Sequence, residues 1–162
     1  MARKSPQPTP GQRAAAWVRT WFARRQGHYA PEDSPADDWR GRGGHERHKK
    51  GWRAERYAAR RLWALGYHNL ERNVTVGRGE LDIIAEKDDV LVFIEVKSGH
   101  ERPDYTPADR VDASKRKQLT RLGNDYINQR GLGDVSHRYD IVEVFLDQRD
   151  IPIRMDIHEA AI

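Results

Sequence analysis

The stretch GELDIIAEKDDVLVFIEVK, residues 79–97, decides the fold because it reads as two strands joined by a tight turn. Apolar and β-branched residues fill both halves, as expected for strands in a buried sheet. Asp88 and Asp89 lie between the halves and are residues that favour turns. If they form a two-residue hairpin loop, Lys87 pairs with Val90 and the register of the whole hairpin follows.

This register places Asp82 opposite Glu95 on one side of the sheet, with Cβ atoms roughly 5 Å apart. Lys97 follows on the same side because side chains alternate along a strand. Two carboxylates this close repel by about 3 kcal/mol at an effective dielectric constant of about 20. A divalent cation between them would explain the pairing. The alternative is a surface salt-bridge cluster, in which Lys97 neutralises Glu95 and Asp82 is a charge at the strand edge.

The pattern on either side of the hairpin predicts an α/β domain with a central mixed sheet flanked by helices, in the order α-β-β-β-α-β. Gly66 and Gly131 are expected to end the two helices. Alternating apolar residues mark the remaining strands. The predicted elements are a helix from Trp52 to Leu65, a strand from Tyr67 to Val76, the two-stranded hairpin at 80–97, a loop from Ser98 to Asp109, a helix from Val111 to Arg130, a strand from Arg138 to Leu146 and a last edge strand from Ile151 to Ile157.

Glu55 falls on the apolar side of the first predicted helix. The buried stripe of this helix is predicted to contain Ala58, Ala59, Leu62 and Leu65, and Glu55 is three and four residues before the two alanines. A buried carboxylate is costly unless it is paired or bound to a cation. Glu55 therefore either reaches solvent at the edge of the stripe or points over the sheet toward Asp82 and Glu95.

The charge of the chain is concentrated in its first fifty residues. Residues 1–50 contain 11 Lys and Arg against 5 Asp and Glu, a net charge of +6, whereas the whole chain carries +4. We expect residues 1–50 to be a largely disordered, flexible basic arm and residues 51–162 to be the folded domain. Residues 12–26 have the spacing of an amphipathic helix, for which binding to a membrane surface is an alternative to loose docking.

The composition limits the classes of function. The chain of 162 residues has no Cys, which excludes disulfides and thiolate metal sites and fits a reducing cytoplasm. No apolar run approaches the ~20 residues that span a bilayer, so stable membrane insertion is not expected. A basic arm on a nearly neutral domain is common among proteins that bind nucleic acids.

In these motifs and their order the chain resembles the YraN-like family of uncharacterised bacterial proteins. That family is similar to the restriction-endonuclease-like superfamily, also called PD-(D/E)xK, and within it to the archaeal Holliday junction resolvases. The matching stretches are Gly51-Trp52-Arg53-Ala54-Glu55, Gly66-Tyr67, Arg72-Asn73, Gly79-Glu80-Leu81-Asp82, Val92-Phe93-Ile94-Glu95-Val96-Lys97, Lys115 and Arg138-Tyr139-Asp140.

The resemblance implies a catalytic role for Asp82, Glu95, Lys97 and Glu55. Asp82 and Glu95, with the Val96 carbonyl, would hold Mg²⁺ or Mn²⁺, which prefer oxygen ligands. Lys97 would orient a water molecule and offset charge in the transition state. Glu80 would support Asp82 from the same face.

The second predicted helix supplies the candidates for nucleic-acid binding. Lys115 and Gln118 are one helical turn apart, so both are placed to touch a phosphate. Arg116, next to Lys115, belongs to the same basic run, for which a solvated helix face is the alternative. Resolvase-like relatives also imply a homodimer.

Two other candidates carry less weight. His45 and His48 have a metal-ligand spacing but lie in a Gly-rich stretch with no third ligand nearby. His100 follows the hairpin and is placed either to contact substrate or simply to face solvent. The loop from Ser98 to Asp109 departs from the family pattern, so its substrate contacts are not carried over.

The function predicted from the sequence is a metal-dependent endonuclease that hydrolyses DNA, in particular branched or otherwise structured DNA. DNA is favoured over RNA. A nucleic-acid-binding protein of the same fold without hydrolysis is the first alternative. A scaffold that binds a partner through its basic arm is the second.

Overall fold

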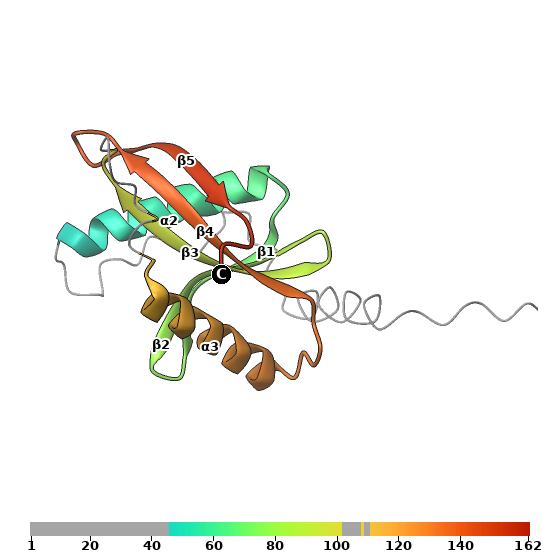
Figure 1. The fold of residues 1–162 in the computed structure, drawn as a ribbon. Helices are drawn as coiled ribbons and strands as arrows, with labels where there is room; N and C mark the ends of the chain where they lie inside the picture. Colours follow the sequence, from blue (N-terminus) through green and yellow to red (C-terminus); the bar gives the residue numbers. More distant parts are fainter. Residues whose placement is uncertain (1–45, 102–107, 109–110) are drawn as a thin grey trace, which may run out of the picture.

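The computed structural model describes residues 46–101, 108 and 111–162 (Figure 1). The amphipathic segment predicted at residues 12–26, and His45 with it, lie outside the described residues. The elements are α2 (Glu46–Ala64), β1 (His68–Val76), β2 (Gly79–Lys87), β3 (Val90–Gly99), α3 (Ala113–Arg130), β4 (His137–Leu146) and β5 (Pro152–His158). The predicted order of helices and strands is confirmed, including the last edge strand.

The five strands form one mixed sheet in the order β1-β2-β3-β4-β5. Neighbouring strands are antiparallel except for β3 and β4, which are parallel. A parallel pair needs a long crossover between its strands, and α3 lies within that connection. The predicted class, an α/β fold with a mixed sheet flanked by helices, is therefore correct.

The β2–β3 hairpin has the predicted register at its turn. Lys87 pairs with Val90, and the ladder continues in step to Ile83 opposite Ile94. Asp88 and Asp89 have φ values of 52° and 64°. Positive φ at both central residues is the geometry of the two-residue turn that matches the twist of a hairpin.

The start of α2 differs from the prediction. Residues 46–50, which the sequence places in the linker, are the first residues of α2. The end of the buried stripe also differs, because α2 stops at Ala64 and Leu65 is 50 % exposed. Gly66 follows with a φ of 86°, a conformation that suits glycine and ends the helix.

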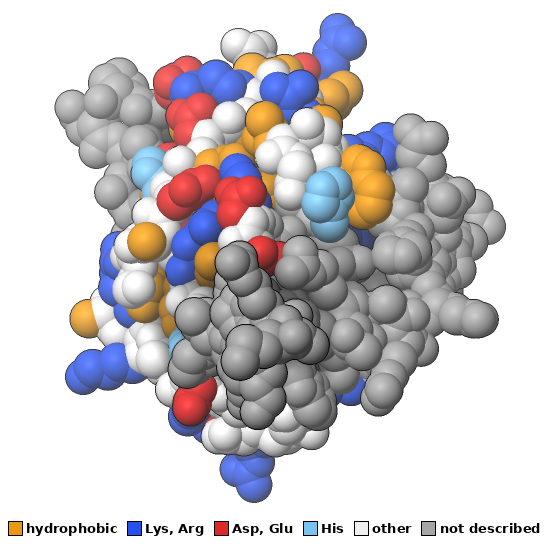
Figure 2. Space-filling model, turned by 90° about the vertical axis from the view of Figure 1, so that its right-hand side faces the viewer, with side chains coloured by type: hydrophobic (Ala, Val, Ile, Leu, Met, Phe, Trp, Pro, Cys, Tyr) orange, Lys and Arg blue, Asp and Glu red, His pale blue; other side chains and the backbone are white. Residues whose placement is uncertain are grey.

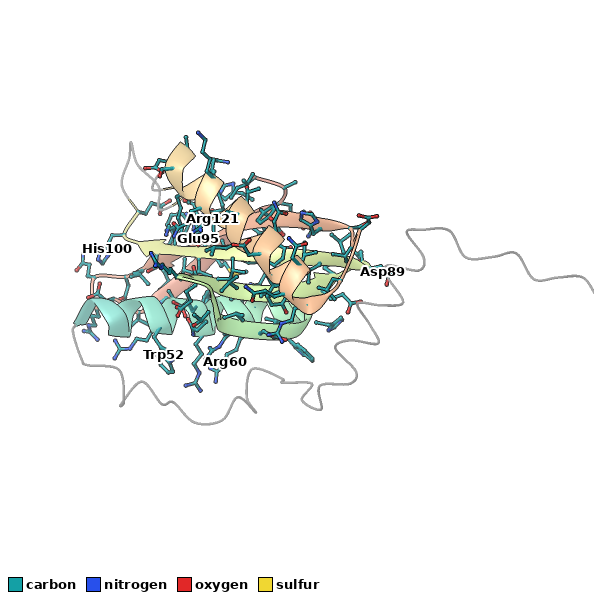
Figure 3. All side chains as sticks on the ribbon, turned by 90° about the horizontal axis from the view of Figure 1, so that it is seen from below. Trp52, Arg60, Asp89, Glu95, His100 and Arg121 are labelled. Carbon is teal, nitrogen blue, oxygen red and sulfur yellow. The ribbon has the colours of Figure 1, made fainter. Side chains whose placement is uncertain are left out.

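The two helices cover opposite faces of the sheet, as Figure 3 shows in a view along the layers. Each face has its own hydrophobic cluster. The cluster between α2 and the sheet includes Ala54, Ala58, Leu62, Ile83, Val92, Ile94, Val142 and Val144. The cluster between α3 and the sheet includes Leu81, Ile84, Phe93, Leu119, Leu122, Tyr126, Tyr139 and Ile141. The central strands β3 and β4 contribute to both clusters, which is why their apolar runs are nearly continuous.

Both ends of α3 are capped. The Asp112 side chain accepts a hydrogen bond from the Lys115 N–H at 2.8 Å, which fixes the first turn. Gly131, with a φ of 63°, donates its N–H to carbonyl oxygens of the last turn. None of the described helices is long and apolar enough to cross a membrane.

Candidate active site

Glu95 is the most deeply buried member of the predicted cluster, with 2 % of its surface exposed. It lies on β3 between the two helices (Figure 3). Its Oε1 atom contacts the Lys97 Nζ at 2.5 Å and the Lys115 Nζ at 2.9 Å. Its Oε2 atom is buried and has no hydrogen-bond partner among the described residues. The predicted Lys97–Glu95 pair is therefore present, but the reading as a surface cluster is wrong.

Asp82 bonds to the backbone of the neighbouring strand. Its Oδ2 accepts a hydrogen bond from the Val96 N–H at 2.8 Å. The paired residues of β2 and β3 extend only to Ile83 and Ile94, so the side chain of Asp82 replaces the next rung of the ladder. The expectation of a regular pair between Asp82 and Glu95 is corrected in this respect.

The regular alternation of β2 breaks at Asp82. Leu81 packs in the cluster beneath α3, whereas Ile83, two residues on, packs beneath α2. In an unbroken strand these two residues would share one face. Asn73, across from Asp82 on β1, has a φ of 52°. Because the strand changes faces at this point, Asp82 is close enough to both helices to interact electrostatically with them.

The charge environment of Asp82 shows which groups surround it. Burial, and then the Glu95 carboxylate, raise the pKa of Asp82 to about 6. The Val96 N–H and the ammonium groups of Lys115 and Lys97 act in the opposite direction. Asp82 therefore lies close to Glu95, as predicted, and shares its lysines.

Glu55 joins this cluster from α2. Burial, and then the Asp82 carboxylate, raise the pKa of Glu55 to about 7. A hydrogen bond from Asn73 and the charge of Arg72 offset part of this effect. Of the two alternatives for Glu55, the position beside Asp82 is the one observed.

Glu80 and Val96 have smaller parts in this arrangement. Glu80 is exposed, and its charge contributes to the raised pKa of Glu55. Val96 donates its N–H to Asp82. A role for the Val96 carbonyl oxygen as a metal ligand stays a prediction.

The three candidates on α3 separate in the structure. Lys115 reaches into the cluster and contacts Glu95 rather than facing solvent. Arg116 donates hydrogen bonds to the carbonyl oxygens of Val111 and Ala161, so its guanidinium links α3 to the C-terminal residues. Gln118 is exposed.

His100 is also exposed, and its Nε2 lies 3.2 Å from Asp150 on the β4–β5 turn. The contact belongs to the rim of the domain, so the solvent-facing alternative fits His100 better than a substrate contact.

A buried carboxylate on β4, Glu143, was missed by the sequence reasoning. Glu143 is 2 % exposed, accepts the Ala108 N–H at 2.7 Å and lies 2.6 Å from the His158 Nε2. It pairs with Lys97 in the β3–β4 register. A polar residue inside an otherwise apolar strand was the signal that could have revealed it.

The carboxylate oxygens of the site are the kind of ligand that a divalent cation prefers. Glu95 has a buried oxygen without a hydrogen-bond partner among the residues that the structure describes, and hard cations take such carboxylate oxygens as ligands. No three described His, Asp or Glu side chains are grouped closely enough to hold a metal by themselves. A cation at Asp82 and Glu95 would therefore need carbonyl and water oxygens as well, which is usual for Mg²⁺.

Comparisons with known proteins assign this chain to a family. The Uncharacterised protein family UPF0102 matches residues 54–144, which include Glu55, Asp82, Glu95, Lys97 and Lys115. A UPF0102 protein of Moorella thermoacetica is 40 % identical over 104 residues, covering 64 % of this chain and 87 % of the relative. UPF0102 proteins of Chloroherpeton thalassium and Kosmotoga olearia are 36 % and 42 % identical over 98 and 96 residues, covering 60 % and 59 % of this chain and 76 % and 82 % of the relatives. The chain belongs to the UPF0102 family.

Proposed function

We propose that this protein is a metal-dependent endonuclease that hydrolyses phosphodiester bonds of DNA. The observation that carries the proposal is the buried Glu95 carboxylate, which has one oxygen held by two lysines and the other without a hydrogen-bond partner in the described part of the chain. Burial of this carboxylate costs desolvation free energy, and a protein that needed only a stable sheet would gain nothing from it.

Asp82 and Glu95 would hold the cation, Mg²⁺ or Mn²⁺, and Val96 would offer its carbonyl oxygen. When bound, such a cation supplies Lewis-acid chemistry and lowers the pKa of a coordinated water. Glu55, whose pKa of about 7 is close to neutrality, is suited to exchange a proton with a water near Asp82.

The two lysines would serve the phosphate. Lys97 and Lys115 already place two positive charges at Glu95 Oε1, on the α3 side of the sheet. Charges arranged in this way before the reaction stabilise the additional negative charge of a phosphoryl transition state. Lys97 would in addition orient the attacking water, as the resemblance implies.

Branched or otherwise structured DNA is the substrate that the resemblance to the archaeal resolvases supports. One observation favours a second candidate, a nucleic-acid-binding protein without hydrolysis. Glu95 already shares the charge of two ammonium groups, so the cluster is largely neutralised without a cation.

A cleavage assay with Mn²⁺ tests the proposal. The substrates are linear, single-stranded, flapped and four-way DNA, and the proteins are the wild type, Lys97→Ala and Asp82→Asn. We expect cleavage by the wild type and its loss in both variants, because each variant removes one member of the cluster. Cleavage that survives in Lys97→Ala would contradict the mechanism.

Binding of Mn²⁺, followed by calorimetry, separates the two candidates. A nuclease binds the cation and loses this binding in Asp82→Asn with the fold intact. A protein that only binds nucleic acid shows no such dependence. Lys117→Ala, an exposed change on the same helix as Lys115, is the matched control and should leave both cleavage and binding of Mn²⁺ unchanged.

A further inference from the structure

The outer face of α2 carries a stripe of arginines that the candidate active site does not use. Between Gly51 and Ala64 the helix has four arginines, Arg53, Arg56, Arg60 and Arg61, and one acid, Glu55. Glu55 lies on the buried side beside Asp82, so between Gly51 and Ala64 the side facing solvent carries positive charge alone. Figure 3 shows Arg60 and Trp52 projecting from the side of α2 that faces away from the sheet.

Three of the four arginines project into solvent, whereas Arg56 is half-buried and lies over the ring of Trp52. Arg53, Arg60 and Arg61 are exposed, and none of them forms an ion pair with another described residue. Like charges three or four residues apart weaken a helix by about 0.2–0.5 kcal/mol per pair. Attraction to the negative end of the helix favours Arg61, in the last turn, but does not extend to Arg53.

The stripe lies on the side of α2 opposite Glu55. Arg53 is two residues from Glu55 on the same helix, and the stripe continues to Arg60 about 10 Å farther along the axis. By contrast, the side of the molecule drawn in Figure 2 shows acidic and basic side chains interspersed. The charge on α2 therefore forms a row of arginines along the outer face of the helix.

We propose that the outer face of α2 binds the sugar-phosphate backbone of a nucleic-acid duplex. Guanidinium groups match phosphate oxygens, and each contact releases condensed counterions. Backbone contacts of this kind position a duplex without reading its sequence. The inference rests on the proposed function for the choice of polymer, but not for any chemistry at Glu95.

An anionic membrane is a less suitable partner for this face. A helix that lies in a membrane interface inserts an apolar side, and the apolar side of α2 is buried against the sheet. Among the described residues the exposed large hydrophobic side chains are Leu65, Ile151 and Ile153, which lie outside α2. The aromatic residues of α2 are also partly buried, so the face offers charge rather than a platform for stacking.

The test measures binding of the full chain to labelled DNA and RNA duplexes in EDTA, so that cleavage does not interfere. Salt is varied between about 50 and 200 mM KCl. The variant Arg53→Gln/Arg60→Gln is compared with Arg78→Gln/Arg149→Gln, which removes the same charge from exposed positions outside the helices. Glutamine is nearly as good a helix former as arginine, so α2 should be retained.

We expect Arg53→Gln/Arg60→Gln to bind about tenfold more weakly at about 100 mM KCl, with a salt slope shallower by about 2. Its binding of Mn²⁺ should equal that of the wild type, which separates this inference from the proposed function. Equal weakening by Arg78→Gln/Arg149→Gln would overturn the inference, because net charge alone would then explain binding. Wild-type protein that binds phosphatidylserine vesicles but neither duplex would overturn it as well.

Discussion

At the scale of single residues, the cost of burying Glu95 is shared between two lysines from different elements. Lys97 comes from the same strand and Lys115 from α3, and both meet the same oxygen atom. A buried charge that loses its partner is strongly destabilising, whereas one that keeps a second partner is tolerated better. Either lysine alone should therefore be able to offset the charge of Glu95 when the other is removed.

A double-mutant cycle with Lys97→Met and Lys115→Met tests this redundancy. Each single change should lower the free energy of unfolding by about 1–3 kcal/mol. The double change should cost more than the sum by about 0.5–3 kcal/mol, because only then is Glu95 left without a cation. Urea unfolding at about pH 8 measures all four proteins, and Lys117→Met should change stability by less than about 0.5 kcal/mol. Additive costs would show that the lysines act independently.

Glu55 should make the protein less stable as the pH rises. Its pKa is about 7 in the folded chain against an ordinary value of 4.5, so between these values the folded state holds a proton that the unfolded state has released. The free energy of unfolding therefore falls through this window, by at most about 3 kcal/mol.

The variant Glu55→Gln should lose this dependence. We expect it to be more stable than the wild type above about pH 7, and to match it more closely near pH 4.5, in the absence of divalent cations. Urea midpoints across the window measure the difference. Glu101→Gln, which removes an exposed carboxylate paired with Arg154, is the control and should follow the wild-type profile. A Glu55→Gln profile with the wild-type slope would contradict the assignment.

At the scale of elements, α3 approaches the sheet most closely at Gly123. A Cβ atom at Gly123 would lie 2.3 Å from the Tyr139 hydroxyl and 2.8 Å from its ring. The hydroxyl is fixed by donating to the Thr120 carbonyl at 3.2 Å, and the ring stacks on Phe93. Neither group can move away easily, so this contact sets the spacing between helix and sheet.

Gly123→Ala should therefore destabilise the protein even though alanine is the better helix former. The expected loss is about 1–3 kcal/mol of unfolding free energy, from overpacking against Tyr139. Gly79→Ala is the informative comparison, because its Cβ would lie 2.8 Å from the methyl carbons of Leu122, an aliphatic side chain that no hydrogen bond holds in place. Thermal unfolding of both variants measures the difference, and equal losses would show that the close approach to Tyr139 has no special cost.

The sequence predicted well those features that depend on short-range chemistry. The Asp88-Asp89 turn has one common solution, and it set the hairpin register. The break at Asp82 was not predicted, because a bare pattern assumes unbroken alternation. The contact of Lys115 with Glu95 was not predicted either, since spacing along a helix does not reveal which strand the helix faces.

At the scale of the whole molecule, β3 is the centre of the structure. It lies third in a sheet of five strands, contributes to the clusters on both faces and carries Glu95 and Lys97. Every residue of the edge strand β5 is at least partly exposed. Opening of β3 requires the loss of contacts on both faces, whereas β5 can detach from one edge.

Hydrogen exchange followed by NMR should show this difference. Amides of β3 from Val92 to Ile94 should exchange only through global unfolding, and amides of β5 should exchange faster through local opening. Addition of urea should accelerate β3 in step with the global transition and affect β5 less. Protection of β3 equal to that of β5 would contradict the central role assigned to it.

The parallel pairing of β3 with β4 has a consequence for the order of events during synthesis. Glu55, Asp82, Glu95 and Lys97 all leave the ribosome before Lys115, and β4 follows later still. A nascent chain that has reached Lys97 thus holds the acidic side chains of the site, but neither α3, which supplies Lys115, nor β4, which pairs with β3. The charge cluster can be completed only when most of the domain has been released, so an immature chain lacks the finished site.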